Sequence, residues 1–548
     1  MKNFFAFLRQ LFPPIQRAPD KNVANIGDNV QIGQFAQGSN ILQLHIGAFV
    51  FPVRTLLALI GITLAAAVAV WWGVTPSQMP QGGAAANVAL VAFGVRDAQG
   101  KVTSSAEGSA LSEWLYNRLN LELADMPETV RLNFWQLATN WDLPHLFQKR
   151  VTAPPQTEAD VERIAQQVGA SIVLYGNLVQ GQSAEAFVPQ LYVAQKKGEA
   201  DELTGSQQLG QPIPLPTPLN DEYLAANLQP LGRALVWFSR GLQNDLNGRY
   251  DLAYQILKQG EQNLTDWDEN QGKEVLYYFI GREALFLANC ESDARIVFAP
   301  TDTLSGVAQA LTEAENYFTR AQTLAERNGR TYARATFGLG QVALQRAQRE
   351  LIPPDATTVG QCRINAPLSG ASLTCPPRRA PNTDAESLQR ARVYIAQAVA
   401  LFDRALTELP QPAPPRLESK MRGARASADV LRAQLELLAQ QPADAETWAQ
   451  SAQAALTPLT RATARDDRRT LATIYLALGA AHLANANARL AQQDNVNGKI
   501  QLQNALAAYD ACVQLIPSDE PDAFLRTNLL PHCVCTRRDA QTILDGAP

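Results

Sequence analysis

The stretch that decides the fold runs from Trp237 to Gly260 and reads WFSRGLQNDLNGRYDLAYQILKQG. In it Trp237, Gly241, Ala253, Leu257 and Gly260 lie at offsets 0, 4, 16, 20 and 23. Two antiparallel helices approach closely only where side chains are missing, and large side chains fill the groove between neighbours. The stretch therefore predicts a hairpin of two tightly packed helices.

The spacing in this stretch resembles the tetratricopeptide repeat, whose helix pairs stack into an α-solenoid. Later parts of the chain keep the pattern at wider spacing: Gly281 with Ala314, Phe318 and Ala321; Gly340 with Ala398, Phe402, Ala405 and Pro410; Gly479 with Ala505, Tyr509 and Pro517. The resemblance implies that residues 223–548 form tetratricopeptide-like helical repeats. The alternative is a generic helical bundle with alanine-rich interfaces.

One further helix pair is expected within residues 416–465, although its first helix lacks a clear signature. Its second helix should present Ala455, Leu459 and Ala462 to its neighbours. We count about five units, and Asp522 to Leu544 is expected to cap the exposed end of the array.

A small α/β domain is expected at residues 87–204. Strands are predicted at 88–95, 130–135, 171–179 and 186–194, and helices at 107–123 and 158–168. The order β-α-β-α-β-β indicates helices packed on a sheet. Residues 205–222 follow, in which four prolines occupy alternate positions from Pro212 to Pro218, so we expect a semi-rigid linker there.

Three stretches of this domain resemble the amino-terminal domain of TolB-like envelope proteins. They are Val88–Phe93, Leu111–Leu119, and the run from Val161 through Gly169 to Gly176. The resemblance implies a binding or assembly domain rather than a catalyst. The loop at residues 140–156 departs from the family pattern, so no ligand of that family is assigned to this chain.

A transmembrane helix is expected at residues 51–75, because residues 55–74 carry no charge and match the roughly 30 Å hydrocarbon layer. The alternative is a cleaved signal peptide. Five basic residues precede the run and none follows it before Arg96. Lys and Arg residues close to a span are retained on the cytoplasmic side of the membrane. The chain is therefore expected to be a single-pass protein of the cell membrane, with its amino terminus cytoplasmic and its C-terminal bulk outside.

Residues 1–50 are expected to form a cytoplasmic segment with a small β module. Glycines punctuate the β-branched stretch 22–47, which favours short strands joined by tight turns. The module is either a docking tag for a partner or a spacer.

The sequence shows no arranged catalytic motif and no cofactor or metal site. Its net charge of −5 provides no field that would attract nucleic acid. Cys362 and Cys375 are expected to form a disulfide, and Cys512 is expected to pair with Cys533 or Cys535. Zinc ligation by the run from His532 to Cys535 with Cys512 is the weaker alternative, and the pairing of Cys290 stays open.

The functional hypothesis is a membrane-anchored interaction scaffold that binds a protein or peptide partner outside the cytoplasm. The first helices of a solenoid line a concave surface. The candidate partner-binding residues there are Arg233, Arg240, Asn244, Tyr277 and Arg282. Two rival hypotheses are a transmembrane sensor that relays an external signal to the β module, which a homo-oligomer held by the span would support, and an envelope hydrolase. The partner and the oligomeric state stay open.

Overall fold

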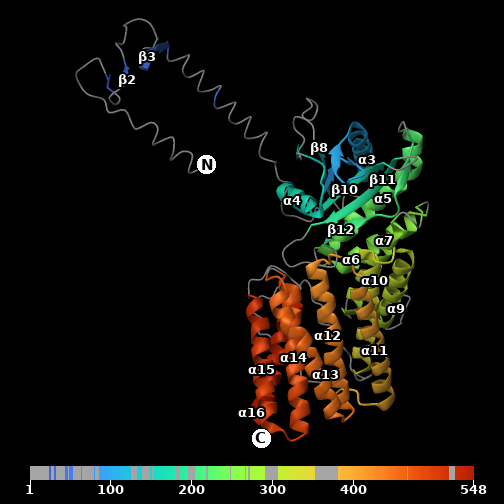
Figure 1. The fold of residues 1–548 in the computed structure, drawn as a ribbon, viewed down its shortest axis with the longest axis vertical. Coiled ribbons are helices and arrows are strands. Elements are labelled where there is room, and N and C mark those ends of the chain that lie inside the picture. Colours follow the sequence, from blue (N-terminus) through green and yellow to red (C-terminus); the bar gives the residue numbers. More distant parts are fainter. Residues whose placement is uncertain are drawn as a thin grey trace. The chain divides into compact units, whose positions relative to one another are not determined.

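The structure is a computed structural model (Figure 1). It describes residues 86–124, 132–138, 149–150, 153–180, 185–194, 204–216, 220–246, 249–265, 267–268, 272–289, 306–351, 381–465, 467–517 and 525–547, four short strands between residues 24 and 52, and the single residues 63 and 79. The chain divides into two compact units, residues 1–77 and 78–548.

The first unit contains a four-stranded antiparallel sheet. Its strands are β1 (Ala24–Asn25), β2 (Val30–Ile32), β3 (Gln43–Ile46) and β4 (Phe49–Pro52), and they lie in chain order. Three of them fall in the stretch 22–47 that was expected to hold short strands, and β4 extends the sheet beyond it.

The predicted transmembrane helix requires correction. Of residues 55–74 the structure describes only Thr63, and no helix among the described residues is long and apolar enough to cross a membrane. A membrane span requires a continuous apolar helix, because a backbone in hydrocarbon must satisfy its own hydrogen bonds, and the described residues contain no such helix. This finding overturns the single-pass localisation and the orientation derived from the flanking basic residues.

The second unit begins with a nine-stranded mixed sheet. Its main path follows the order β12-β11-β10-β5-β8-β9, formed by β12 (Gly205–Gln208), β11 (Glu185–Val193), β10 (Ile172–Gln180), β5 (Ala86–Val91), β8 (Leu132–Ala138) and β9 (Lys149–Arg150). The other strands are β6 (Gly94–Arg96), β7 (Val102–Ser104) and β13 (Ile213–Leu215). β5 is parallel to β10 and β8, with Val88 opposite both Ile172 and Phe134. The α/β character predicted for this region is confirmed.

Helices cover both faces of this sheet. Along β5, Val88 and Leu90 face the core that contains α3 (Ala106–Ala124), whereas Ala89 and Val91 face the core that contains α4 (Glu158–Val168). Side chains alternate between the faces of a strand, so a strand buried on both sides reads as a continuous apolar run.

The segment 205–222 is not a linker. It supplies the strands β12 and β13, both paired with β11, and the start of the helix α5 (Asp221–Leu246). Proline is tolerated at a sheet edge because it need not donate a ladder hydrogen bond there. Between the prolines, Ile213 and Leu215 are buried, and these alternating apolar residues distinguish an edge strand from an extended spacer.

Helices make up nearly all of the rest of this unit's described residues. They are α5, α6 (Tyr250–Asn263), α7 (Lys273–Asn289), α9 (Gly306–Leu324), α10 (Arg330–Glu350), α11 (Ala385–Thr407), α12 (Pro415–Leu438), α13 (Pro442–Ala462), α14 (Arg468–Ala491), α15 (Asn495–Leu515), the short η2 (Leu525–Leu529) and α16 (Leu530–Gly546). Each helix packs on the next, and α7, α10, α12 and α14 also contact one another in succession. Figure 1 shows the later helices as an array of antiparallel rods.

The glycines identified in the sequence lie where helices approach most closely. A Cβ atom built on Gly281 would lie 3.0 Å from Phe318, one on Gly340 would lie 2.6 Å from Phe402, and one on Gly479 would lie 2.4 Å from Tyr509. These are the glycine–aromatic pairs expected from the spacing. Each glycine therefore provides the space that an aromatic ring of the following helix fills.

The expected face of α13 is partly wrong. Leu459 is buried, but Ala455 and Ala462 are exposed, and the buried stripe runs instead through Ala445, Ala449, Ala452 and Leu456. The high alanine content of this helix makes several stripes look alike in the sequence, so the sequence pattern alone does not fix which one is buried.

The sheet and the helices share one hydrophobic core. Leu115 and Leu119 of α3 lie against α5, at the contact nearest to Gly232, and the same cluster of buried residues extends from Val88 to Val342. The α/β region is therefore continuous with the first helix pairs rather than a separate domain.

A disulfide closes the carboxyl-terminal end of the array. Cys512 of α15 is bonded to Cys533 of α16, with 6.1 Å between their Cα atoms. This is one of the two pairings expected for Cys512. Cys535 is also disulfide-bonded, whereas Cys290, Cys362 and Cys375 lie outside the described residues.

Candidate functional site

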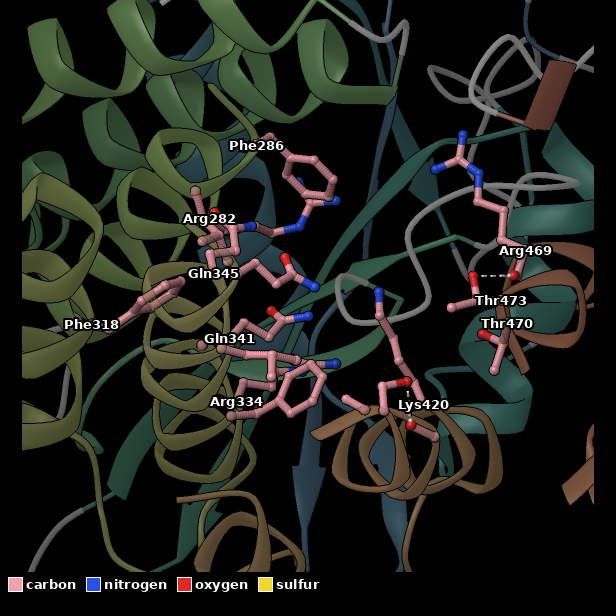
Figure 2. Close-up of a pocket in the computed structure, with 18 of the residues that line it drawn as sticks. Arg282, Phe286, Phe318, Arg334, Gln341, Gln345, Lys420, Arg469, Thr470 and Thr473 are labelled. Carbon is pink, nitrogen blue, oxygen red and sulfur yellow. Dashed lines mark hydrogen bonds between the residues drawn. The ribbon is translucent and has the colours of Figure 1, made fainter. Parts of the chain in front are cut away.

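A cavity of about 320 Å³ lies on the face where α7, α10, α12 and α14 follow one another. These are the first helices of four successive pairs. Figure 2 shows one wall with Arg282, Arg334, Gln341 and Gln345, and the opposite wall with Lys420, Arg469, Thr470 and Thr473. The cavity is therefore assembled from parts of the chain almost 200 residues apart.

Four cationic side chains line the cavity, one from each helix: Arg282, Arg334, Lys420 and Arg469. No Asp or Glu is among its described lining residues. Cations in a partly enclosed site raise the local concentration of anions, because the surrounding protein has a low dielectric constant.

Neutral polar groups lie between these cations. Gln341, Gln345 and Gln348 are spaced by four and three residues on α10, which places them on one helical face. On the other wall, the Ser427 hydroxyl donates to the Gly423 carbonyl (2.9 Å), and the Thr473 hydroxyl donates to the Arg469 carbonyl (2.9 Å). The amides are thus the main neutral groups that can both donate to and accept from a ligand.

Apolar side chains form much of the remaining lining. Phe318, Phe337, Leu344 and Ile474 contribute carbon surface. Phe337 is buried against Phe402, with 5.5 Å between the ring centroids. A ligand that fills the cavity would therefore meet both apolar and cationic surface.

Two carboxylates that do not line the cavity hold the Arg282 side chain in place. Its Nη1 atom donates to Asp245 Oδ1 (2.6 Å) and to Glu283 Oε1 (2.7 Å), and its guanidinium lies 4.4 Å from the centre of the Phe286 ring. With 3% of its surface exposed, this guanidinium is almost fully removed from water. Buried charges require such partners, and the two carboxylates fix its orientation at the wall.

Arg334 connects the cavity to the sheet. It is 1% exposed, and its Nη2 atom donates to the Thr204 carbonyl (2.9 Å), next to the edge strand β12. One helical turn earlier, Arg330 donates through both Nη atoms to the Glu158 carboxylate of α4 (2.9 and 2.6 Å). This bidentate pair and the Arg334 contact together brace the first turns of α10 against the α/β region.

The contacts at this junction lower the pKa of the Glu158 carboxylate. Burial acts to raise its pKa, but the hydrogen bond and charge of Arg330, together with the backbone N–H of Ser206, outweigh burial and leave the pKa below its usual value. The carboxylate therefore stays ionised, as the bidentate pair requires.

Of the five residues predicted to bind a partner, Arg282 lines the cavity and the other four do not. Arg240 is buried against Trp237, 5.5 Å from its ring centre, and burial lowers its pKa. Asn244 donates to the Arg240 carbonyl (2.9 Å) within α5. Tyr277 is buried and stacks with Arg320, whose guanidinium lies 3.8 Å from the ring centre.

The fifth predicted residue, Arg233, is half-buried on α5 and does not line the cavity. Three of the five predicted positions lie on α5 and two on α7, whereas the described cavity begins at α7. The candidate site is the face formed by α7, α10, α12 and α14, which includes one of the predicted residues.

Sequence reasoning missed Arg334, Lys420, Arg469 and the glutamines of α10. A signal for part of this set exists in the register around the packing glycines. The positions three before, one after and four after the glycine line the cavity: Tyr278, Arg282 and Leu285 on α7; Phe337, Gln341 and Leu344 on α10; Lys420, Ala424 and Ser427 on α12. The lining residues of α14 follow a different register, so this rule would not have found Arg469.

Among the described residues, no group of three or more His, Cys, Asp or Glu side chains is placed to hold a metal ion.

Comparisons with known proteins do not support the two resemblances read from the sequence. No model of a known protein family matches the chain, and no curated protein matches it at a significant level. The identification as a tetratricopeptide-repeat protein with a TolB-like domain is therefore corrected to a mainly helical chain with a small α/β region and consecutively packed helices. Small and large residues at these spacings occur wherever helices pack closely, so they report packing geometry and do not specify a family.

Proposed function

We propose that this protein is a binding scaffold whose helix pairs form a solenoid and hold a segment of a protein or peptide partner in the cavity of the first helices. The observation that carries the proposal is the cavity itself, built across four successive first helices from cations, amides and apolar side chains. Its volume of about 320 Å³ suits a few side chains of a ligand rather than a folded domain. Sites for small ligands generally span about 300–1,000 Å³.

The proposal assigns no reaction to the cavity. Catalysis by a hydroxyl needs a base beside it, but no His, Asp or Glu is among the described lining residues. Ser427 and Thr473 donate their hydroxyl protons to carbonyls of their own helices, which is how such residues are satisfied in helix interiors.

The α/β region has a supporting role in this proposal. It buries α5 against α3, and through Glu158 and Thr204 it contacts the start of α10, which carries a large part of the cavity wall. A ligand site is held most precisely by rigid elements that are themselves braced.

The test first selects, from a random display library, peptides that bind the full chain. The binding of these peptides to two tryptophan variants of the protein is then measured. Ala424→Trp places a large side chain into the cavity from α12. Arg422→Trp is the matched control on the same helix, because Arg422 is 56% exposed on its side chain and does not line the cavity. Selected peptides should bind the control like the unmodified protein and lose binding to Ala424→Trp. Peptides that bind both variants equally would show that the partner is recognised elsewhere.

A further inference from the structure

The charge of the lining indicates the sign of the ligand. Asp245 and Glu283 lie behind Arg282, so their charges offset that guanidinium from outside the cavity. Arg334 on the same wall, and the half-buried Lys420 and Arg469 on the opposite wall, complete a lining in which every described charged residue is a cation. Carboxylates of a ligand are attracted into such a site, and ammonium groups are repelled.

The glutamines of α10 indicate that the ligand has a polypeptide backbone. A side-chain amide both donates and accepts, as does each peptide group of an extended chain. Gln341, Gln345 and Gln348 present such amides along one face of α10, which lines the cavity over two helical turns. A simple anion or a fatty acid offers no series of alternating donors and acceptors to match them.

The apolar lining indicates that the ligand also buries a large hydrophobic side chain. Phe337 and Ile474 line the cavity from α10 and α14, and Gly423 and Ala424 line it from α12, which contacts both helices and adds little side-chain bulk there. Burial of apolar surface is the dominant favourable term in most association, which makes such a contact the main source of affinity.

We infer that the cavity binds an extended acidic peptide, with carboxylates directed to Lys420 and Arg469, its backbone along the glutamines of α10, and one large apolar side chain between Phe337 and Ile474. This inference rests on the proposed scaffold function and specifies the chemistry of the partner.

The experiment measures fluorescence polarisation of labelled decapeptides on the full chain. The probe peptide alternates glutamate with serine around a central Leu-Phe pair. One matched peptide carries lysine in place of each glutamate, and a second carries serine in place of Leu-Phe. Dodecanoate serves as an unlabelled competitor. The probe should bind at least about tenfold more tightly than either matched peptide, and its affinity should fall as salt is raised.

Protein variants locate the effect. Lys420→Gln combined with Arg469→Gln should weaken binding of the acidic probe by about tenfold, because two partly buried ion pairs contribute on the order of this factor. The control combines Arg422→Gln with Arg468→Gln, two exposed neighbours on the same helices, and should leave the affinity unchanged. Gln341→Leu keeps the approximate size of the side chain but removes its amide. This variant should bind the acidic probe more weakly and should gain no affinity for dodecanoate.

The outcomes separate this inference from the proposed function. Equal binding of the lysine peptide, or equal loss in the control pair, would overturn the acidic assignment. Displacement of the probe by dodecanoate, with no effect of Gln341→Leu, would identify an amphiphile site instead of a peptide site. If library-selected peptides require the open cavity but carry no acidic residues, the inference fails while the scaffold function stands.

Discussion

Alanine at Gly340 should destabilise the protein, whereas alanine at Gly423 should stabilise it. Replacing a glycine in a helix interior by alanine contributes up to about 1 kcal/mol, because glycine loses more backbone freedom on folding. At Gly340, however, the new Cβ would lie 2.6 Å from two carbons of Phe402. That ring is fully buried and packs against Phe337, so it has little room to move.

Overpacking of this kind costs about 1–3 kcal/mol, which outweighs the helix gain and leaves a net loss of about 1 kcal/mol. At Gly423 the new Cβ would meet Ile474 at 3.4 Å, an ordinary contact, so the helix gain of about 0.5–1 kcal/mol remains. The same substitution thus has opposite signs at two positions on adjacent first helices.

Hydrogen exchange measured by mass spectrometry on the full chain is the suitable assay, because a chain of several packed units need not unfold in one step. Peptides from α10 and α11 in Gly340→Ala should exchange faster by about fivefold, the equivalent of about 1 kcal/mol. Peptides from α12 in Gly423→Ala should exchange more slowly. Slower exchange in both variants would refute the reasoning that Gly340 provides space for the Phe402 ring.

Three further predictions concern ionisation and the disulfide. Arg330 holds the pKa of the Glu158 carboxylate below its usual 4.5, so the ionised carboxylate stabilises the junction above that pH and loses this contribution as the pH falls through the lower folded pKa. Hydrogen exchange of β12 should therefore accelerate in acid. The Glu158→Gln variant should lack this pH dependence. Burial raises the pKa of Glu274 to about 7, so folding should weaken as the pH rises from about 4.5 to about 7, and thermal melting of Glu274→Gln should lack this decline. Replacing Cys533 by serine removes the disulfide to Cys512, which spans a sequence separation of 21 residues, and should lower the stability of this part of the fold by about 3 kcal/mol. The loss should appear as faster hydrogen exchange confined to α15 and α16. Unchanged exchange there would show that the disulfide does not stabilise the end of the array.

The helix packing was readable from the sequence because glycine and a large aromatic residue leave a distinct signature. Gly340 and Phe402 are 62 positions apart, yet they meet as expected, since a missing side chain is needed where a ring approaches a helix. In α13 the same reasoning failed, because alanines occupy both the buried position 452 and the exposed position 455. Small residues alone do not determine which stripe of a helix is buried.

The linker prediction failed because proline has two roles in extended chains. Alternating prolines suit a spacer, but they also suit an edge strand that turns its unpaired side away from the sheet. Ile213 and Leu215, which lie between the prolines in β13, are buried. Their apolar character was the available sign that the segment packs on something.

The position of the candidate site could not be predicted in the same way. A cavity depends on which faces of four helices converge, and its cations come from positions as distant as Arg282 and Arg469. Arg240 and Arg282 both lie beside a packing glycine, but Arg240 precedes Gly241 and Arg282 follows Gly281. In the structure Arg240 packs on Trp237, whereas Arg282 reaches the cavity.

The most direct test of the scaffold function is the pattern of hydrogen-exchange protection when the acidic Leu-Phe decapeptide is added to the unmodified full chain. A ligand held by the first helices should slow exchange in α7, α10, α12 and α14, the four helices that contribute most of the cavity lining. The second helices α11, α13 and α15 should be unaffected, since no residue of theirs is among the described lining. Protection confined to the second helices or to the sheet would contradict the assignment of the cavity as the binding site.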